Sequence, residues 1–339
     1  MKEVRVALIG YGGIGHAHAV GYRVLIERGA PVRLVAVCDI DGAKFESEVN
    51  INLGTAKAYL PEGTRRYTDV SELIANEEFD MVDICLPTYL HKEYAIRFMR
   101  LGKHVLSEKP MALSSADCEE MLAASRETGA HLMIGQCLRF NESYGFLKEC
   151  VEDGRFGKLR RMVMKRISRL PRWGFENWFT VTERSGGCIL DMHIHDVDMA
   201  RYLLGEPKAV SCWAWDGEVR WQYEQSHLYY DGCDVLIEGS WDESDQTPFS
   251  AVLRARFDTA QVEIASNTVK VYPDEGEAYE PDVKVTNHMA NEIAFLANLI
   301  LDPTANNMKN PPESAAATVR LIEHLRESAE RGAERIELT

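Results

Sequence analysis

The sequence predicts an α/β fold, with an N-terminal Rossmann-type, doubly wound parallel sheet and a C-terminal α/β domain built on a large open, mainly antiparallel sheet. Before residue 136, short apolar runs alternate with segments of helical periodicity, which is typical of parallel sheets with right-handed crossovers. Between residues 208 and 272, apolar and polar residues alternate with period two, which is typical of antiparallel strands. The 339 residues suffice for two domains, which we place at 1–136 and 137–339.

The N-terminal domain is expected to alternate strands with helices. Apolar runs predict strands at 4–9, 34–39, 81–86 and 104–106, and the pattern changes at 131–136. After the helix that follows the first strand, further helices are expected at 41–57, 70–75, 92–101 and 114–128.

The C-terminal domain is expected to combine a sheet with a few helices. Strands are predicted at 158–167, 210–215, 235–241, 250–257 and 261–264, with an edge strand at 336–338. Helices are predicted at 142–152, within 181–205, at 285–301 and at 312–331. The last helix has an apolar stripe, Ala316, Val319, Ile322, Leu325 and Ala329, that needs a sheet to cover it.

The first strand runs directly into a Gly-x-Gly-x-x-Gly sequence and a helix, the context in which this pattern binds a dinucleotide. Gly10 permits the tight turn, Gly12 lets the backbone approach a pyrophosphate, and Gly15 lets the helix pack closely. Free amides at the start of the helix favour the anion. The predicted cofactor-binding residues here are Gly10, Gly12, Gly13, Ile14 and Gly15. A glycine turn that serves helix packing alone is the alternative.

Asp39 ends the second predicted strand, 24 residues after Gly15. This is close to the spacing of roughly 20 residues at which a carboxylate binds the adenosine ribose. Because a carboxylate there would repel a 2′-phosphate, we expect NAD rather than NADP.

Two further loops follow buried strands and should open onto the same crevice, since ligands gather at the carboxyl ends of parallel strands. Pro87 and Thr88 follow one strand, and Glu108 and Lys109 follow the next. We expect all four to contact the cofactor. A lysine there could also stabilise an alkoxide as hydride leaves, although a solvated lysine at the rim is the simpler alternative.

Composition excludes several classes of partner. The net charge is −15 and no basic run occurs, which argues against nucleic acid and anionic membranes. The eight cysteines are scattered without paired spacing, and no apolar run is long enough for a signal sequence or a membrane span. The pattern favours a cytoplasmic protein with reduced, buried thiols.

Residues 191–198 hold the second concentration of polar side chains, after Gly186-Gly187. We expect a helix here, on which Asp191, His195 and Asp198 share one face. The rings of His193 and His195 would diverge by about 200° on such a helix, so no metal site is expected. His195, oriented by neighbouring carboxylates, could act as a general base. A buried structural histidine beside helix-start carboxylates is the alternative.

These motifs, with Gly-Lys-His-Val-Leu-Ser-Glu-Lys-Pro at 102–110, resemble the glucose-fructose oxidoreductase and inositol dehydrogenase family, Gfo/Idh/MocA. The resemblance runs in order over nearly the whole chain. It implies a dinucleotide-binding domain, then a domain whose open sheet forms a homodimer or homotetramer. It further implies that Lys109, Asp191 and His195 are the catalytic residues.

The sequence departs from the family pattern at two places. His193 stands where many members carry a small residue or glycine, which implies a narrower substrate pocket or an extra hydrogen-bonding group there. Asn141-Glu142 stands where a proline is common, which implies a reshaped domain junction.

The sequence thus leads to one functional hypothesis and two rivals. The hypothesis is oxidation of a secondary hydroxyl on a small polyhydroxylated substrate, namely a sugar, sugar acid or cyclitol. His195 takes the proton, Lys109 steadies the oxygen and Asp191 fixes the substrate. One rival is a hydrolase- or lyase-type enzyme that uses tightly bound NAD for transient oxidation. The other is a non-catalytic nucleotide-binding sensor.

Overall fold

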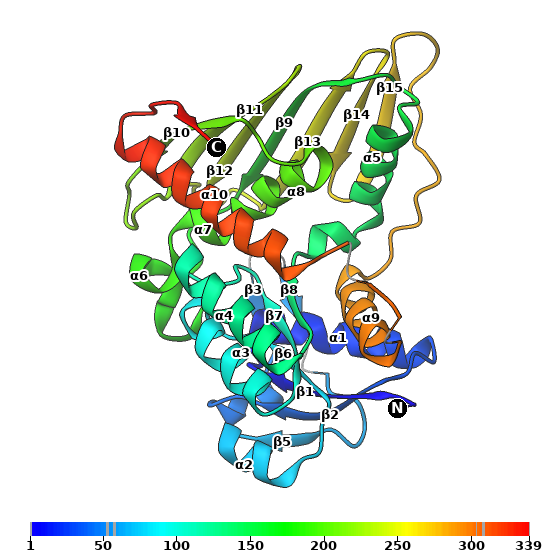
Figure 1. Cartoon of the computed structure of the whole chain (residues 1–339), viewed down its shortest axis with the longest axis vertical. Helices are drawn as coiled ribbons and strands as arrows, with labels where there is room; N and C mark the ends of the chain where they lie inside the picture. Colours follow the sequence, from blue (N-terminus) through cyan, green and yellow to red (C-terminus); the bar gives the residue numbers. More distant parts are fainter. Residues whose placement is uncertain (1, 52–53, 57–58, 303, 307–308, 339) are drawn as a thin grey trace. The chain divides into compact units, whose positions relative to one another are not determined.

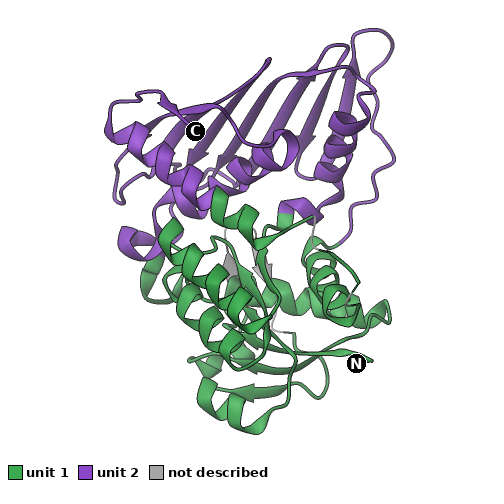
Figure 2. Ribbon diagram, in the orientation of Figure 1, with its two compact units in different colours: residues 1–137, 173–178, 287–317 green, residues 138–172, 179–286, 318–339 purple. Residues whose placement is uncertain are grey.

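The computed structural model describes residues 2–338 except 52–53, 57–58, 303 and 307–308, and shows two compact units (Figures 1 and 2). Unit 1 comprises residues 1–137, 173–178 and 287–317, and unit 2 comprises 138–172, 179–286 and 318–339. Residues 173–178 and 287–317 pack with unit 1, although they were expected in the C-terminal domain. The functional division of the chain at residue 136 stays a prediction.

Unit 1 is built on a six-stranded, fully parallel sheet in the order β5-β2-β1-β6-β7-β8. The strands are β1 (Val4–Ile9), β2 (Val32–Cys38), β5 (Arg65–Tyr67), β6 (Met81–Ile84), β7 (His104–Glu108) and β8 (Leu132–Gly135). The strand order reverses between β1 and β6, and ligands of doubly wound sheets bind at the carboxyl ends of the strands at such a point. The predicted Rossmann sheet is therefore confirmed, although β5 and β8 are absent from the predicted strands.

Helices cover both faces of this sheet. They are α1 (Gly13–Glu27), α2 (Val70–Asn76), α3 (His91–Arg100), α4 (Ser115–Thr128) and α9 (His288–Leu301). In Figure 1, α3 and α4 lie on one face, and α1 and α9 pack together on the other. Capping residues explain where α4 begins and ends: Ser114 accepts a hydrogen bond from the amide of Asp117, and Gly129 has φ +70°.

The predicted helix at 41–57 is wrong. A short 3₁₀ helix, η1 (Gly42–Phe45), is followed by an antiparallel hairpin of β3 (Val49–Ile51) and β4 (Gly54–Ala56). The β-branched residues Val49, Ile51 and Thr55 and the glycine at the start of β4 favour strands over a helix. Residues 52–53 and 57–58 of the predicted helix lie outside the described residues.

Unit 2 is built on an eight-stranded sheet in the order β15-β14-β13-β9-β12-β11-β10-β16. The strands are β9 (Leu159–Ile167), β10 (Ala209–Trp215), β11 (Tyr223–Tyr230), β12 (Cys233–Ser240), β13 (Ser250–Phe257), β14 (Ala260–Ala265), β15 (Thr268–Pro273) and β16 (Ile336–Glu337). Every pair is antiparallel except β9 with β12. The predicted mainly antiparallel sheet and its edge strand near the C-terminus are confirmed.

The helices of unit 2 cover one face of its sheet (Figure 1). They include α5 (Glu142–Asp153), α8 (Ile194–Leu204) and α10 (Pro312–Glu330), whose residues from 318 onward belong to this unit. Val319, Ile322 and Leu325 of α10 are fully buried, as the predicted apolar stripe requires. Large apolar side chains are exposed on β10 and β12, namely Trp213, Trp215 and Leu236.

The composition also led us to expect buried cysteines and no membrane-spanning segment. All eight cysteines are buried. Within the described ranges, no helix has both the length and the apolar composition that crossing a membrane requires.

The turn between β1 and α1 shows why two of its glycines are needed for packing. A Cβ at Gly10 would overlap the carbonyl oxygen of Cys85, and a Cβ at Gly15 would overlap that of Gly10. A Cβ at Gly12 would meet no protein atom within 4 Å. Gly12 is therefore not required by the fold, and the open space beside it is where a pyrophosphate was expected.

This difference predicts opposite effects for two alanine substitutions. Gly15→Ala should lower the free energy of unfolding by about 1 to 3 kcal/mol, because the added methyl group forces α1 away from the turn. Gly12→Ala should leave the melting temperature unchanged and weaken nucleotide binding. Thermal unfolding and titration with NAD measure the two effects, and a destabilised Gly12→Ala variant would contradict the assignment.

Candidate functional site

Asp39 lies directly after β2, and its carboxylate is already engaged within unit 1. It accepts hydrogen bonds from the backbone amides of Tyr11 (2.7 Å) and Asp41 (2.9 Å). The ammonium group of Lys44 lies 3.0 Å and 3.1 Å from its two oxygens. The sequence analysis missed Lys44, five residues downstream, which places a cation beside the acid expected to repel a 2′-phosphate.

The loops after β6 and β7 bring together the four predicted residues Pro87, Thr88, Glu108 and Lys109. The two strands pair in parallel, with Ile84 opposite Ser107. Thr88 begins the short helix η2 (Thr88–Leu90), which continues into α3. Thr88 and Glu108 are buried, and Lys109 is partly exposed. These residues thus lie at the carboxyl ends of two neighbouring parallel strands, and their contact with the cofactor stays a prediction.

His91 connects these two loops. Its Nδ1 lies 2.7 Å from the carbonyl oxygen of Pro110, and its Nε2 lies 2.8 Å from that of Leu86. The ring is 1% exposed. The sequence analysis treated residues 92–101 only as a helix and did not single out this histidine.

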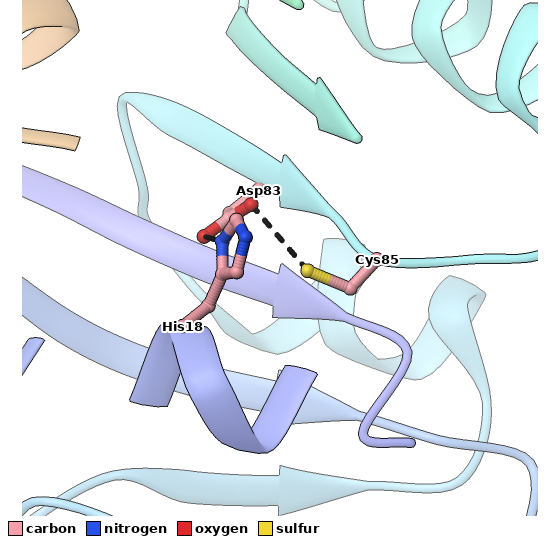
Figure 3. Close-up of side chains that lie close together, drawn as sticks. All are labelled: His18, Asp83 and Cys85. Atoms are coloured by element: carbon pink, nitrogen blue, oxygen red, sulfur yellow. Dashed lines mark hydrogen bonds and ion pairs between the residues drawn. The ribbon is translucent and has the colours of Figure 1, made fainter. Parts of the chain in front are cut away.

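Beneath the same edge of the sheet lies a buried polar cluster around His18 of α1 (Figure 3). Its Nδ1 is 2.9 Å from Asp83 Oδ2 and its Nε2 is 3.0 Å from Glu108 Oε1. The Sγ of Cys85 lies 3.7 Å from the other Asp83 oxygen. Burial alone would lower the pKa of His18, but its interactions with Asp83 and Cys85 together hold that pKa well above the usual value.

A further titratable side chain, Glu292 of α9, faces this cluster. Its Oε1 lies 3.8 Å from His18 Nε2, and neither of its oxygens has a hydrogen-bond partner among the described residues. Burial raises the pKa of Glu292 well above its usual range. Ligand atoms of His18, Glu108 and Glu292 lie within 4.8 Å of one another, so the cluster also has the composition of a cation site.

The segment 191–198 in unit 2 is not one regular helix, contrary to the prediction. The short helix α7 (Cys188–Asp191) ends before α8 begins at Ile194. The amides of Met192 and His193 both bond to the carbonyl of Cys188, so the chain is locally widened between the two helices. Asp191 and His195 therefore sit on different helices, and both are partly exposed while the other residues of the segment are buried.

Asp196 and Asp198 form buried ion pairs with arginines that the sequence analysis missed. Arg166 lies 2.8 Å and 2.9 Å from the Asp196 oxygens, and Arg139 lies 2.8 Å and 2.7 Å from those of Asp198. The hydroxyl of Thr318 also lies 3.0 Å from Asp198. Asp198 is therefore the partner of a buried arginine. From the sequence, Asp198 was expected only to share a helix face with His195, and this ion pair was not expected.

His193, expected to alter the substrate pocket, is instead fully buried within unit 2. Its Nε2 lies 2.8 Å from the hydroxyl of Ser226, and its Nδ1 lies 3.5 Å from Glu224. Burial lowers the pKa of His193 to about 3 and raises that of Glu224 well above its usual range, so burial favours the neutral form of both side chains. The other departure, Asn141, caps α5 by accepting a hydrogen bond from the amide of Ser143.

The chain matches two family models. "Oxidoreductase family, NAD-binding Rossmann fold" matches residues 4–136, and "GFO/IDH/MocA C-terminal domain" matches residues 144–275. The chain is 29% identical over 293 residues to myo-inositol 2-dehydrogenase of Thermotoga maritima, covering 84% of this chain and 77% of that one. It is 31% identical over 206 residues to 2,7-anhydro-N-acetylneuraminate hydratase of Mediterraneibacter gnavus, covering 60% and 50%.

Among solved structures, a levoglucosan dehydrogenase in complex with NADH and L-sorbose superposes with a TM-score of 0.83. The two sequences are 16% identical and each chain is covered completely, so this likeness concerns the fold. Together with the two family models, these findings show that the chain belongs to the Gfo/Idh/MocA family of oxidoreductases, whose NAD-binding Rossmann fold it carries in residues 4–136.

Proposed function

We propose that the protein is an NAD-dependent dehydrogenase that oxidises a secondary hydroxyl of a sugar, sugar acid or cyclitol. The observation that supports this most directly is the partial exposure of Asp191 and His195 in a segment whose other residues are buried. The family, and a relative named for an inositol substrate, agree with a polyhydroxylated substrate.

The residues of unit 1 fit a bound NAD. The space beside Gly12 is open, and the first amides of α1 have no side-chain cap. These features suit a pyrophosphate at a helix N-terminus. When bound, NAD supplies the hydride acceptor.

We propose that Lys109 of unit 1 and Asp191 and His195 of unit 2 serve one reaction. His195 takes the hydroxyl proton as general base. Lys109 stabilises the negative charge that develops on the oxygen. Asp191 accepts a hydrogen bond from a substrate hydroxyl and so fixes its orientation.

A second candidate is a reaction that oxidises its substrate only transiently, as in a hydration or elimination. The similarity to a protein named a hydratase favours this candidate. Accumulation of NADH with substrate distinguishes the two, because a transient oxidation leaves no net NADH.

His195→Ala tests the proposed base. Turnover should fall by about 10²- to 10⁴-fold, the usual contribution of a general base, while NAD binding stays unchanged. Initial rates of NADH formation and titration with NAD measure both quantities. His324→Ala is a matched control, because His324 is a partly exposed histidine of α10 whose ring lies 3.6 Å from the carboxylate of Glu327. Full activity of His195→Ala would remove His195 from the reaction.

Lys44→Ala tests how the protein selects between NAD and NADP. Without the ammonium group, Asp39 should repel a 2′-phosphate more strongly, so the ratio of the NADP to the NAD dissociation constant should rise about three- to tenfold. Lys103→Ala should leave this ratio unchanged, since Lys103 donates to the carbonyl oxygen of Phe79 at the amino end of β7. A ratio that falls in Lys44→Ala would contradict the role given to this lysine.

We also propose that the protein is cytoplasmic and forms a homodimer or homotetramer through the exposed face of the unit 2 sheet. Trp213 and Leu236 lie on that face, 49% and 43% exposed. Trp213→Glu combined with Leu236→Glu should therefore shift the protein to monomers in sedimentation velocity. Leu101→Glu, which changes a comparably exposed leucine of unit 1, should not. An unchanged sedimentation coefficient in the double variant would exclude this face as the interface.

A further inference from the structure

The turn that carries Lys109 is held on both sides by buried histidines of unit 1. Before it, the Oε1 of Glu108 lies 3.0 Å from His18 Nε2, and its Oε2 accepts a hydrogen bond of 3.1 Å from the amide of Lys109. After it, the carbonyl oxygen of Pro110 lies 2.7 Å from His91 Nδ1. The backbone of Lys109 is therefore fixed through a carboxylate on one side and a carbonyl on the other.

The contacts of His18 require a protonated ring. Both nitrogens face carboxylate oxygens, those of Asp83 and Glu108, and a carboxylate only accepts hydrogen bonds. His18 and Asp83 have no exposed side-chain surface. Charge-assisted hydrogen bonds of this kind are about twice as strong as neutral ones. The hydroxyl of Tyr22 donates a hydrogen bond of 2.8 Å to Asp83, so the Asp83 carboxylate that binds His18 is itself held in place.

The surroundings of His18 are consistent with one positive charge there. The titratable groups that face it are Asp83 and Cys85 from β6 and its end, Glu108 from β7, Tyr22 from α1 and Glu292 from α9. Burial raises the pKa of both Cys85 and Glu292, so these two remain neutral. Burial also disfavours charge on Glu108, but the hydrogen bond from His18, together with the positive charges of His18 and Lys109, lowers the Glu108 pKa. The charged groups of the cluster are then the imidazolium of His18 and the carboxylates of Asp83 and Glu108 on its two sides.

His91 extends the support to the neighbouring loop. Its second nitrogen contacts the carbonyl oxygen of Leu86, which directly precedes Pro87 and Thr88. Burial lowers the pKa of His91, and a neutral imidazole has one N–H, so the ring donates a hydrogen bond to one of these two carbonyl oxygens and only contacts the other. The imidazole thus lies between the loop after β6 and the loop after β7.

Building on the proposed function, we propose that His18 and His91 are positioning residues for Lys109, which hold its ammonium group in place for the substrate oxygen. Neither histidine needs to touch the substrate for this role. Catalysis depends steeply on such placement, since a shift of about 1 Å can cost about 10²-fold in rate. By analogy with the hydrogen-bond partners that orient metal ligands, which typically contribute about 10- to 100-fold, we expect a contribution of that size here.

A double-mutant cycle tests this inference. His18→Asn and His91→Leu should each lower kcat about 10- to 100-fold in the otherwise wild-type protein. In the Lys109→Ala background the same substitutions should change kcat by less than about threefold, because no ammonium group is left to position. A merely structural role would give the same fold-change in both backgrounds and would overturn the inference.

A control variant and a substitute variant complete the experiment. His131→Asn is the matched control, since the ring of this partly exposed histidine packs against His104 at the amino ends of β7 and β8. It should leave kcat unchanged in both backgrounds. If His18→Asn does not fold, Glu108→Gln takes its place in the cycle, because it keeps the size of the side chain and removes its charge. An equal loss with and without Lys109 again overturns the inference.

The outcomes separate this inference from the proposed function. If wild-type protein oxidises no sugar, sugar acid or cyclitol, the proposed function fails. If it does so and Lys109→Ala is impaired, but the histidine effects are additive, only the positioning role fails. One equivalent of zinc in the purified protein, lost in His18→Asn, would make His18 a metal ligand and overturn its role as a hydrogen-bond donor.

Discussion

The close approach of α1 to the end of β1 is the constraint on which the rest of unit 1 depends. A side chain at Gly15 would overlap the carbonyl oxygen of Gly10, so only glycine lets the helix lie against the turn. His18 and Tyr22 follow at helical spacing on the same face. Because the helix is close, the His18 ring reaches both Asp83 of β6 and Glu108 at the end of β7. The turn that suits a nucleotide thus also places the network behind the Lys109 turn.

The fold was predictable where the signal is local. Continuous apolar runs predicted β1, β6 and β7, since buried parallel strands need little beyond such a run and a bounding turn. The helix predicted at 41–57 is wrong because that prediction, too, used only the local sequence. Here Val49 and Ile51 alternate with polar residues over a stretch too short for periodicity to separate helix from strand, whereas the structure pairs β3 with β4 as a hairpin.

The site was predictable to the extent that its residues lie in short motifs. Glu108-Lys109 and the pair Asp191 and His195 stand out because polar residues interrupt apolar runs at strand ends and helix starts. Their partners are distant in sequence: Asp198 pairs with Arg139, 59 residues away, and His18 with Glu108, 90 residues away. Spacing along the chain carries no information on such pairs, so carboxylates expected beside His195 turned out to balance buried arginines.

The two units bury histidines in opposite charge states, and the reason lies in what faces each ring. His18 lies between two carboxylates, whose attraction for a proton exceeds the cost of burying charge. His193 faces a hydroxyl and a protonated Glu224, with the cation of Arg166 nearby, so burial dominates and its pKa falls to about 3. The sequence alone therefore does not show whether a buried histidine is charged or neutral. His193 can serve packing as a neutral group, whereas His18 carries a charge that binds two strands of the sheet together behind Lys109.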